Sequence, residues 1–89
     1  MEIEYDSRKA ESNLSKHGIS FEEATTVLYD SAGLAQEDVD STDEYRWVLV
    51  GLSSKANLLT VIYTIKDERI IRLISARKAT RKEARYYAE

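Results

Sequence analysis

LLTVIYTIKDERIIRLISARK, residues 58–78, is the stretch that decides the fold class. Residues 58–65 are rich in β-branched side chains, which favour strands, and residues 69–75 form a second apolar run. Only KDE separates the two runs, a connection of hairpin length, so the two strands must be antiparallel. Simple alternation along the second strand predicts that Leu73 and Ser75 share one of its faces.

The first helix is bounded by two clear signals. Asp6 is a favourable N-cap for a helix that runs to His17, and Gly18 follows as its stop. Lys16 and His17 fall in the last turn, where the helix dipole favours cations. One face carries, at helical spacing, Ala10, Asn13, Leu14 and His17.

Two short stretches share the capping-box pattern, in which a hydroxyl residue is followed three positions later by Glu. SFEE, residues 20–23, opens a second helix that we expect to end near residue 29 or 30. TRKE, residues 80–83, opens a short C-terminal helix through about residue 88. Both patterns predict that the hydroxyl and the carboxylate each bond to the backbone of the first turn.

The remaining segments complete an α+β fold. Residues 33–54 indicate a strand, an acidic loop and another strand. The order predicts two N-terminal helices, a four-stranded antiparallel sheet, to which residues 3–6 can add a short strand, and one C-terminal helix, all in a single domain of residues 1–89. The loop lacks the Gly and the final Glu that an EF-hand calcium loop requires. Its acidic residues are Asp38, Asp40, Asp43 and Glu44.

Composition excludes several classes of protein. With 89 residues, 43% of them hydrophobic and 33% charged, the chain is globular rather than disordered. It has no Cys and a single His, which argues against disulfides and against metal sites, so we expect no metal and no cofactor. It shows neither a secretory signal nor an apolar run of about 18 residues, so we expect a cytoplasmic protein that does not enter a membrane.

Charge is divided unevenly along the chain. Residues 1–45 hold three basic and twelve acidic residues, whereas residues 46–89 hold ten basic and four acidic residues. The division indicates two different electrostatic partners or a distinct anion-binding face; the alternative is that the two halves attract each other in the fold. Basic side chains near tyrosines suit RNA, because guanidinium groups hold phosphates and rings stack on unpaired bases; the alternative is a solvated helix face. The cluster comprises Arg72, Arg77, Lys78, Arg81, Lys82, Arg85, Tyr86 and Tyr87.

Lys16 and His17 are further candidates for chemistry. RNA cleavage requires a deprotonated 2′-hydroxyl, a protonated leaving oxygen and cations that stabilise the phosphate in the transition state. Histidine commonly carries protons near neutral pH, so His17 can serve as acid or base; alternatively, it is a packed residue that caps the helix. Trp47 is expected in the core or at a partner interface, with stacking on a base as the alternative.

Three blocks of the sequence are informative in combination: KAESNLSKHGISFEEA (residues 9–24), GLSSKANLLTVIYT (residues 51–64) and IRLISARKATRKEARYY (residues 71–87). Their patterns N-x-x-K-H-G-[IV]-x-F and I-S-A-R-x-A-[ST]-R-x-E resemble the BrnT family of bacterial toxins. The resemblance implies a ribonuclease toxin of a type II toxin–antitoxin system, with a compact fold similar to that of RelE toxins. With the basic cluster, it leads us to expect a metal-independent endoribonuclease.

The resemblance also implies partners and site residues. The expected partner is a BrnA antitoxin with a ribbon-helix-helix DNA-binding domain, in a heterotetramer with two copies of each chain that represses its own operon. This chain would then meet operator DNA only through the antitoxin. The alternative is a catalytically inert module that binds RNA or antitoxin and acts in operon repression. Glu83 matches the family pattern, and its capping role explains it. The four expected catalytic residues match the two patterns at Lys16, His17, Arg77 and Arg81.

Overall fold

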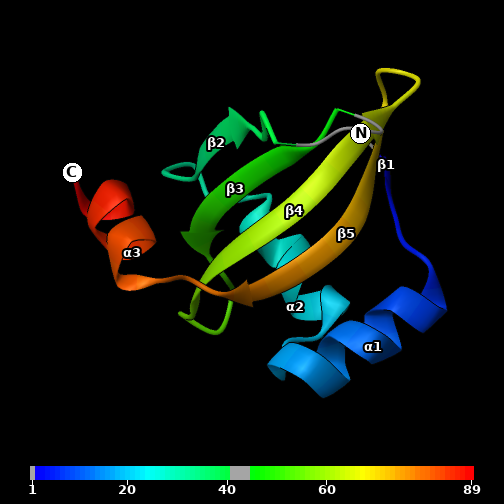
Figure 1. Ribbon diagram of the computed structural model, residues 1–89, viewed down its shortest axis with the longest axis horizontal. Coiled ribbons are helices and arrows are strands. Elements are labelled where there is room, and N and C mark those ends of the chain that lie inside the picture. The colour runs from blue at the N-terminus through cyan, green and yellow to red at the C-terminus, as the bar shows by residue number, and fades with distance from the viewer. Residues whose placement is uncertain (1, 41–44) are drawn as a thin grey trace.

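The computed structural model describes residues 2–40 and 45–89, and Figure 1 shows how its elements are arranged. Asp43 and Glu44 of the predicted acidic loop lie outside the described residues. None of the described helices is long and apolar enough to cross a membrane. The elements are β1 (Glu2–Glu4), α1 (Ser7–His17), α2 (Phe21–Val27), β2 (Leu34–Glu37), β3 (Trp47–Leu52), β4 (Leu58–Lys66), β5 (Ile70–Lys78) and α3 (Arg81–Ala88).

Both predicted boundaries of α1 are confirmed. Asp6 caps the helix by accepting a hydrogen bond from the backbone N–H of Arg8 over 2.7 Å. Gly18 stops it in the left-handed conformation, at φ 71°, where its N–H donates to the carbonyl of Leu14. In contrast, α2 ends at Val27, earlier than the expected residue 29 or 30, because the next N–H groups bond three residues back rather than four.

The sheet has five strands in the order β1-β5-β4-β3-β2. Strands β2 to β5 pair antiparallel with their neighbours, as expected. β1 pairs parallel with β5, with Glu2 opposite Ile70, so the sheet is mixed. The prediction of a four-stranded antiparallel sheet was therefore incomplete. Short loops fix antiparallel pairs, but they carry no information about β1, whose partner is the last strand of the chain.

β5 carries one extra residue, a β-bulge, opposite the step from Ile62 to Tyr63 in β4. Ile62 pairs with Ser75 and Tyr63 pairs with Leu73, which leaves Ile74 outside the register. Because Ile62 and Tyr63 point to opposite faces of the sheet, Leu73 and Ser75 do so too. The prediction that Leu73 and Ser75 share a face was wrong, since alternation along one strand cannot reveal a bulge.

α1 and α2 cover one face of the sheet, and α2 supplies three deeply buried side chains. Phe21, Ala24 and Val27 are at most 1% exposed and belong to one apolar cluster with Leu59 of β4. Trp47 is partly buried and packs against this cluster, at the edge of the core rather than inside it. Burying a side chain such as Phe or Leu contributes roughly 1.5–3 kcal/mol, so the cluster holds the two layers together. Its other buried members are Ile19, Leu49, Val61, Tyr63, Leu73 and Ala76.

α3 lies on the other face of the sheet. Thr60 points away from the apolar cluster, because its neighbour Leu59 points into it. The hydroxyl of Thr60 donates to Glu83 of α3 over 2.9 Å. No residue of α3 is buried, and Figure 1 shows this helix beyond the end of β5, apart from α1 and α2. Polar side chains therefore contribute much of the attachment of α3 to the sheet.

Candidate functional site

A buried asparagine joins α1 to β5. Asn13 is 5% exposed, and its side-chain nitrogen donates to the carbonyl of Ala76 over 2.8 Å. Its side-chain oxygen accepts from the N–H of Ala76 over 3.0 Å, and its nitrogen also donates to the carbonyl of Ile19 over 3.0 Å. Among the described residues, β1 pairs with β5 at residues 70–72, so this amide acts as the partner of β5 further along the strand. Asn13 thereby fixes the last turn of α1 beside the end of β5.

The positioning role of Asn13 was missed from the sequence, which placed this residue on an apolar helix face without a function. A polar side chain on a buried face needs hydrogen-bond partners, and this need was the available signal. Its partner Ala76 lies 63 positions away in the chain. No local pattern connects the two residues.

Lys16 and His17 border a shallow pocket between α1 and β5. Its volume is about 220 Å³, below the roughly 300–1,000 Å³ of pockets that enclose small molecules. Both side chains are exposed to solvent. An open pocket of this size suits one group of a polymer that lies across the surface, such as a phosphate. The rest of its lining comprises Lys9, Ser12, Asn13, Ile74 and Ser75.

Arg77 follows on β5, and its side chain is held by α3. It pairs with Thr60, so it points to the face of the sheet that α3 covers; unbroken alternation from Leu73 would have put it on the other face. Its guanidinium donates to both carboxylate oxygens of Glu83, from Nη1 over 2.7 Å and from Nη2 over 3.0 Å. This bidentate pair lowers the pKa of Glu83 to about 2, and it raises the pKa of Arg77.

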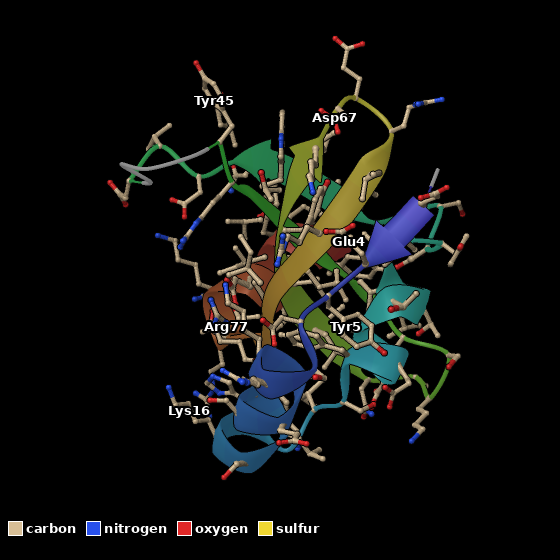
Figure 2. All side chains as sticks on the ribbon, turned by 90° about the vertical axis from the view of Figure 1, so that its right-hand side faces the viewer. Glu4, Tyr5, Lys16, Tyr45, Asp67 and Arg77 are labelled. Atoms are coloured by element: carbon tan, nitrogen blue, oxygen red, sulfur yellow. The ribbon has the colours of Figure 1, made fainter. Side chains whose placement is uncertain are left out.

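The two halves of the expected catalytic set approach the same end of β5 from different elements. Figure 2 shows Lys16 and Arg77 on the same side of the molecule, with Lys16 below Arg77. The pocket that Lys16 and His17 border does not include Arg77 or Arg81. Arg81 is exposed at the first position of α3. The four side chains therefore surround the end of β5 from α1, from the strand itself and from α3.

The residues predicted to bind RNA lie in several different surroundings. Arg72 forms an ion pair with Glu4 of β1 at 3.5 Å. Its register partner Thr64 lies four residues from Thr60, the partner of Arg77, so the two arginines are roughly 13 Å apart along the sheet. Lys78 pairs with Leu59, so it points to the face covered by α1 and α2. The candidates that are exposed on α3 are Lys82, Arg85 and Tyr86.

Tyr87 has a structural partner in the loop after α2. Its hydroxyl donates to the carboxylate of Asp30 over 2.6 Å. This carboxylate also accepts from the N–H of Leu52 over 2.7 Å and from the N–H of Ala32 over 3.0 Å. These three donors, the Tyr87 hydroxyl first among them, lower the pKa of Asp30. Tyr87 thus ties the last turn of α3 to β3, whereas Tyr86 keeps 40% of its surface exposed and available for stacking.

A larger cavity of about 440 Å³ lies at the opposite end of β5, by the turn between β4 and β5. Three carboxylates in its wall would repel a phosphodiester, because like charges at short range are unfavourable. This cavity is therefore a poor candidate for RNA. It is lined by Glu2, Asp67, Glu68, Arg69 and Ile70.

Residues 5–83 match the family model described as the ribonuclease toxin BrnT of type II toxin–antitoxin systems. The chain belongs to the BrnT family. The resemblance inferred from the sequence is thereby confirmed. At the level of the family, the match also supports a ribonuclease toxin and an antitoxin partner. The matched BrnT segment contains all four expected catalytic residues, Lys16, His17, Arg77 and Arg81.

A solved BrnT structure has the same fold. The 1.1 Å crystal structure of the Brucella abortus ribonuclease toxin BrnT superposes with a TM-score of 0.67 at 24% sequence identity. The match covers 91% of this chain and 99% of that chain. No curated protein matches the sequence. At this identity the likeness to the Brucella protein establishes the α+β architecture of the BrnT fold, while the residue roles rest on the geometry above.

Proposed function

We propose that this chain is the toxin of a type II toxin–antitoxin pair and cleaves RNA as a metal-independent endoribonuclease. Lys16 or His17 transfers protons at the scissile phosphate, and Arg77 and Arg81 stabilise its developing negative charge. Cleavage of RNA in the cytoplasm then inhibits translation and growth. The compact fold is proposed to be related to that of RelE toxins.

The observation that carries this proposal is the anchoring of α1 on β5. Asn13 lies three residues before Lys16, and Ala76 directly precedes Arg77. The hydrogen bonds between Asn13 and the backbone of Ala76, at 2.8 and 3.0 Å, therefore bring together two basic segments that are far apart in sequence. Several cations around one strand end suit the phosphate backbone of a nucleic acid.

The proposed partner is a BrnA-type antitoxin with a ribbon-helix-helix domain, in a heterotetramer with two copies of each chain. The antitoxin covers the basic surface and brings carboxylates or backbone carbonyls to it, because a buried arginine without compensation is unfavourable. Operator DNA is contacted only through the antitoxin.

Cleavage in the presence of EDTA tests the proposed reaction. Protein freed of antitoxin should cut RNA, and Ala at Lys16, His17, Arg77 or Arg81 should slow cleavage on the order of 100-fold or more. Lys66→Ala, which removes an exposed cation at the end of β4, is the matched control and should cleave as the wild type does. Intact RNA, together with equal growth inhibition on induction of wild type and Arg77→Ala, would refute the proposal.

A catalytically inert module for RNA or antitoxin binding is the second candidate. The bidentate engagement of Arg77 by Glu83 favours it, because three of the guanidinium hydrogen bonds are already made within the chain. This reading predicts a gel shift without cleavage products and an RNA affinity that falls steeply with salt.

A further inference from the structure

Arg77 presents two hydrogen-bonding edges, and Glu83 occupies one of them. A guanidinium carries five N–H donors in one rigid plane. Nη1 donates to Glu83 and, over 3.3 Å, to the carbonyl of Lys78, while Nη2 donates one hydrogen to Glu83. Within residues 2–40 and 45–89, no hydrogen-bond partner engages Nε–H or the second Nη2–H of Arg77. These two donors point to the same side and form a second fork.

The carboxylate that orients Arg77 is itself fixed by two further hydrogen-bond donors. Oε1 of Glu83 accepts from the backbone N–H of Thr80 over 2.8 Å and from the hydroxyl of Thr60 over 2.9 Å. Thr80 is the N-cap of α3, and Thr60 is a fully buried residue of β4. The Glu83 side chain is only 22% exposed. Glu83 is therefore a rigid support that holds the guanidinium plane in one orientation.

We propose that Glu83 is a positioning residue for RNA cleavage, fixing Arg77 so that its Nε–Nη2 edge donates bidentately to the non-bridging oxygens of a phosphate. This inference rests on the proposed function. A planar fork that is already held in place loses less conformational freedom when it binds a phosphate. Glu83 does not contact the RNA, and its whole effect passes through Arg77.

The negative charge of Glu83 offsets part of the attraction between Arg77 and a phosphate. The exposed cations around the strand end, Lys16 and Arg81 among them, attract the phosphate instead, and the role of Arg77 is to orient it. The opposing interpretation is that Glu83 competes with the phosphate for Arg77. The two interpretations differ in sign, because removing a competitor tightens RNA binding and removing a support weakens it.

A double-mutant cycle distinguishes these interpretations. Glu83→Ala, Arg77→Ala and the double variant are compared in RNA cleavage with EDTA and in affinity for 2′-O-methyl RNA, which lacks the attacking hydroxyl. Glu83→Ala should lower kcat by about 10-fold to 100-fold when Arg77 is present, since small misplacements are expensive in catalysis. In the Arg77→Ala background the same change should alter kcat by less than about twofold. Glu83→Gln, which preserves the shape of the side chain, should act in the same direction and serves if Glu83→Ala does not fold.

Thr80→Ala is the matched control for damage to α3. It removes the hydroxyl that accepts from the N–H of Glu83 over 3.2 Å, and it leaves the carboxylate on Arg77. This variant should cleave RNA at the wild-type rate, although α3 is less stable. If Glu83 served only as a cap, Thr80→Ala and Glu83→Ala would lose activity equally at equal stability.

Each remaining outcome has a defined meaning. Equal losses from Glu83→Ala in both backgrounds, or tighter RNA binding by Glu83→Ala, would overturn the positioning role and leave RNA cleavage standing. RNA left intact by the wild type would overturn both proposals. Arg77→Lys keeps the charge but lacks the fork, so it should be impaired as strongly as Arg77→Ala; full activity of this variant would also overturn the inference.

Discussion

α2 and α3 begin with the same capping-box pattern, yet their two carboxylates have different partners. The hydroxyls behave alike, because Ser20 accepts from the N–H of Glu23 over 3.0 Å and Thr80 accepts from that of Glu83 over 3.2 Å. The carboxylate of Glu83 then returns to the N–H of Thr80 over 2.8 Å and completes the box. The carboxylate of Glu23 bonds to the connection between β3 and β4 instead.

Glu23 is the more deeply buried of the two carboxylates. It is 8% exposed and accepts from the Ser53 hydroxyl and from the Asn57 side-chain nitrogen, each over 2.7 Å. The Asn57 bond, followed by the Ser53 bond, lowers the pKa of Glu23. Neutral donors thus satisfy the buried carboxylate of α2, whereas a guanidinium satisfies the partly exposed carboxylate of α3.

The difference shows which part of a capping box is local. A hydroxyl at the N-cap reaches only its own first turn, so its bond follows from the sequence alone. A glutamate side chain is longer, so its carboxylate can accept hydrogen bonds from donors outside its own turn. Which donors lie near it depends on what the helix packs against. α2 packs into the core beside the connection after β3, while α3 has no buried residue and meets Thr60 and Arg77.

The largest loss of stability should come from removing Glu23, the more deeply buried of the two carboxylates. Glu23→Ala leaves the donors of Ser53 and Asn57 unsatisfied and should lower the free energy of unfolding by about 3 kcal/mol. Urea denaturation measures the change, and Glu11→Ala, at an exposed position of α1, is the control with an expected change within about 0.5 kcal/mol. A loss no larger than that of Glu11→Ala would mean that the network around Glu23 does not stabilise the fold.

Lowering the pH should destabilise the protein through Glu83, by somewhat less than Glu23→Ala destabilises it. The folded-state pKa of Glu83 is lowered from 4.5 to about 2, so its stabilisation is fully present above pH 4.5 and is lost as the pH falls toward 2. The wild type should lose about 2 kcal/mol across this window through Glu83, after allowance for solvent screening. Glu83→Gln should show a correspondingly shallower decline in urea denaturation series. Parallel declines for wild type and variant would contradict the assignment.

The smallest effects should come from the two hydroxyl caps. Ser20→Ala should lower the global free energy of unfolding by about 1 kcal/mol, because α2 is part of the core. Thr80→Ala should lower it by about 0.5 kcal/mol and act mainly on local opening of α3, which has no buried residue. Amide hydrogen exchange separates the two variants. Equal loss of protection across α2 and α3 in both would show that the two helices unfold as one unit.

The elements that follow from local chemistry were predictable from the sequence. The helix starts at Asp6, Ser20 and Thr80 and the stop at Gly18 are confirmed, because each depends on a side chain and the backbone beside it. The hairpin of β4 and β5 is confirmed for the same reason, since a short connection leaves no other pairing.

The arrangement of the candidate site could not be predicted from any short segment of the sequence. The bulge at Ile74 decides which face Arg77 occupies, and it is visible only when β4 and β5 are seen together. The roles of Asn13 and Glu83 depend on partners from other elements, a strand backbone in one case and a guanidinium in the other. Sequence patterns therefore named four candidate residues, and only the three-dimensional arrangement shows that Glu83 holds one of them, Arg77.

The parallel pairing of the first strand with the last has a consequence for biosynthesis. The ribosome releases the N-terminal end first, so residues 2–17 emerge long before their partners at residues 70–76. Contacts between such distant segments form late. Until β5 has been synthesised, neither β1 nor α1 can pack against it. A nascent chain thus holds α1 without the hydrogen bonds between Asn13 and Ala76, and the fold is completed only after the last strand has emerged.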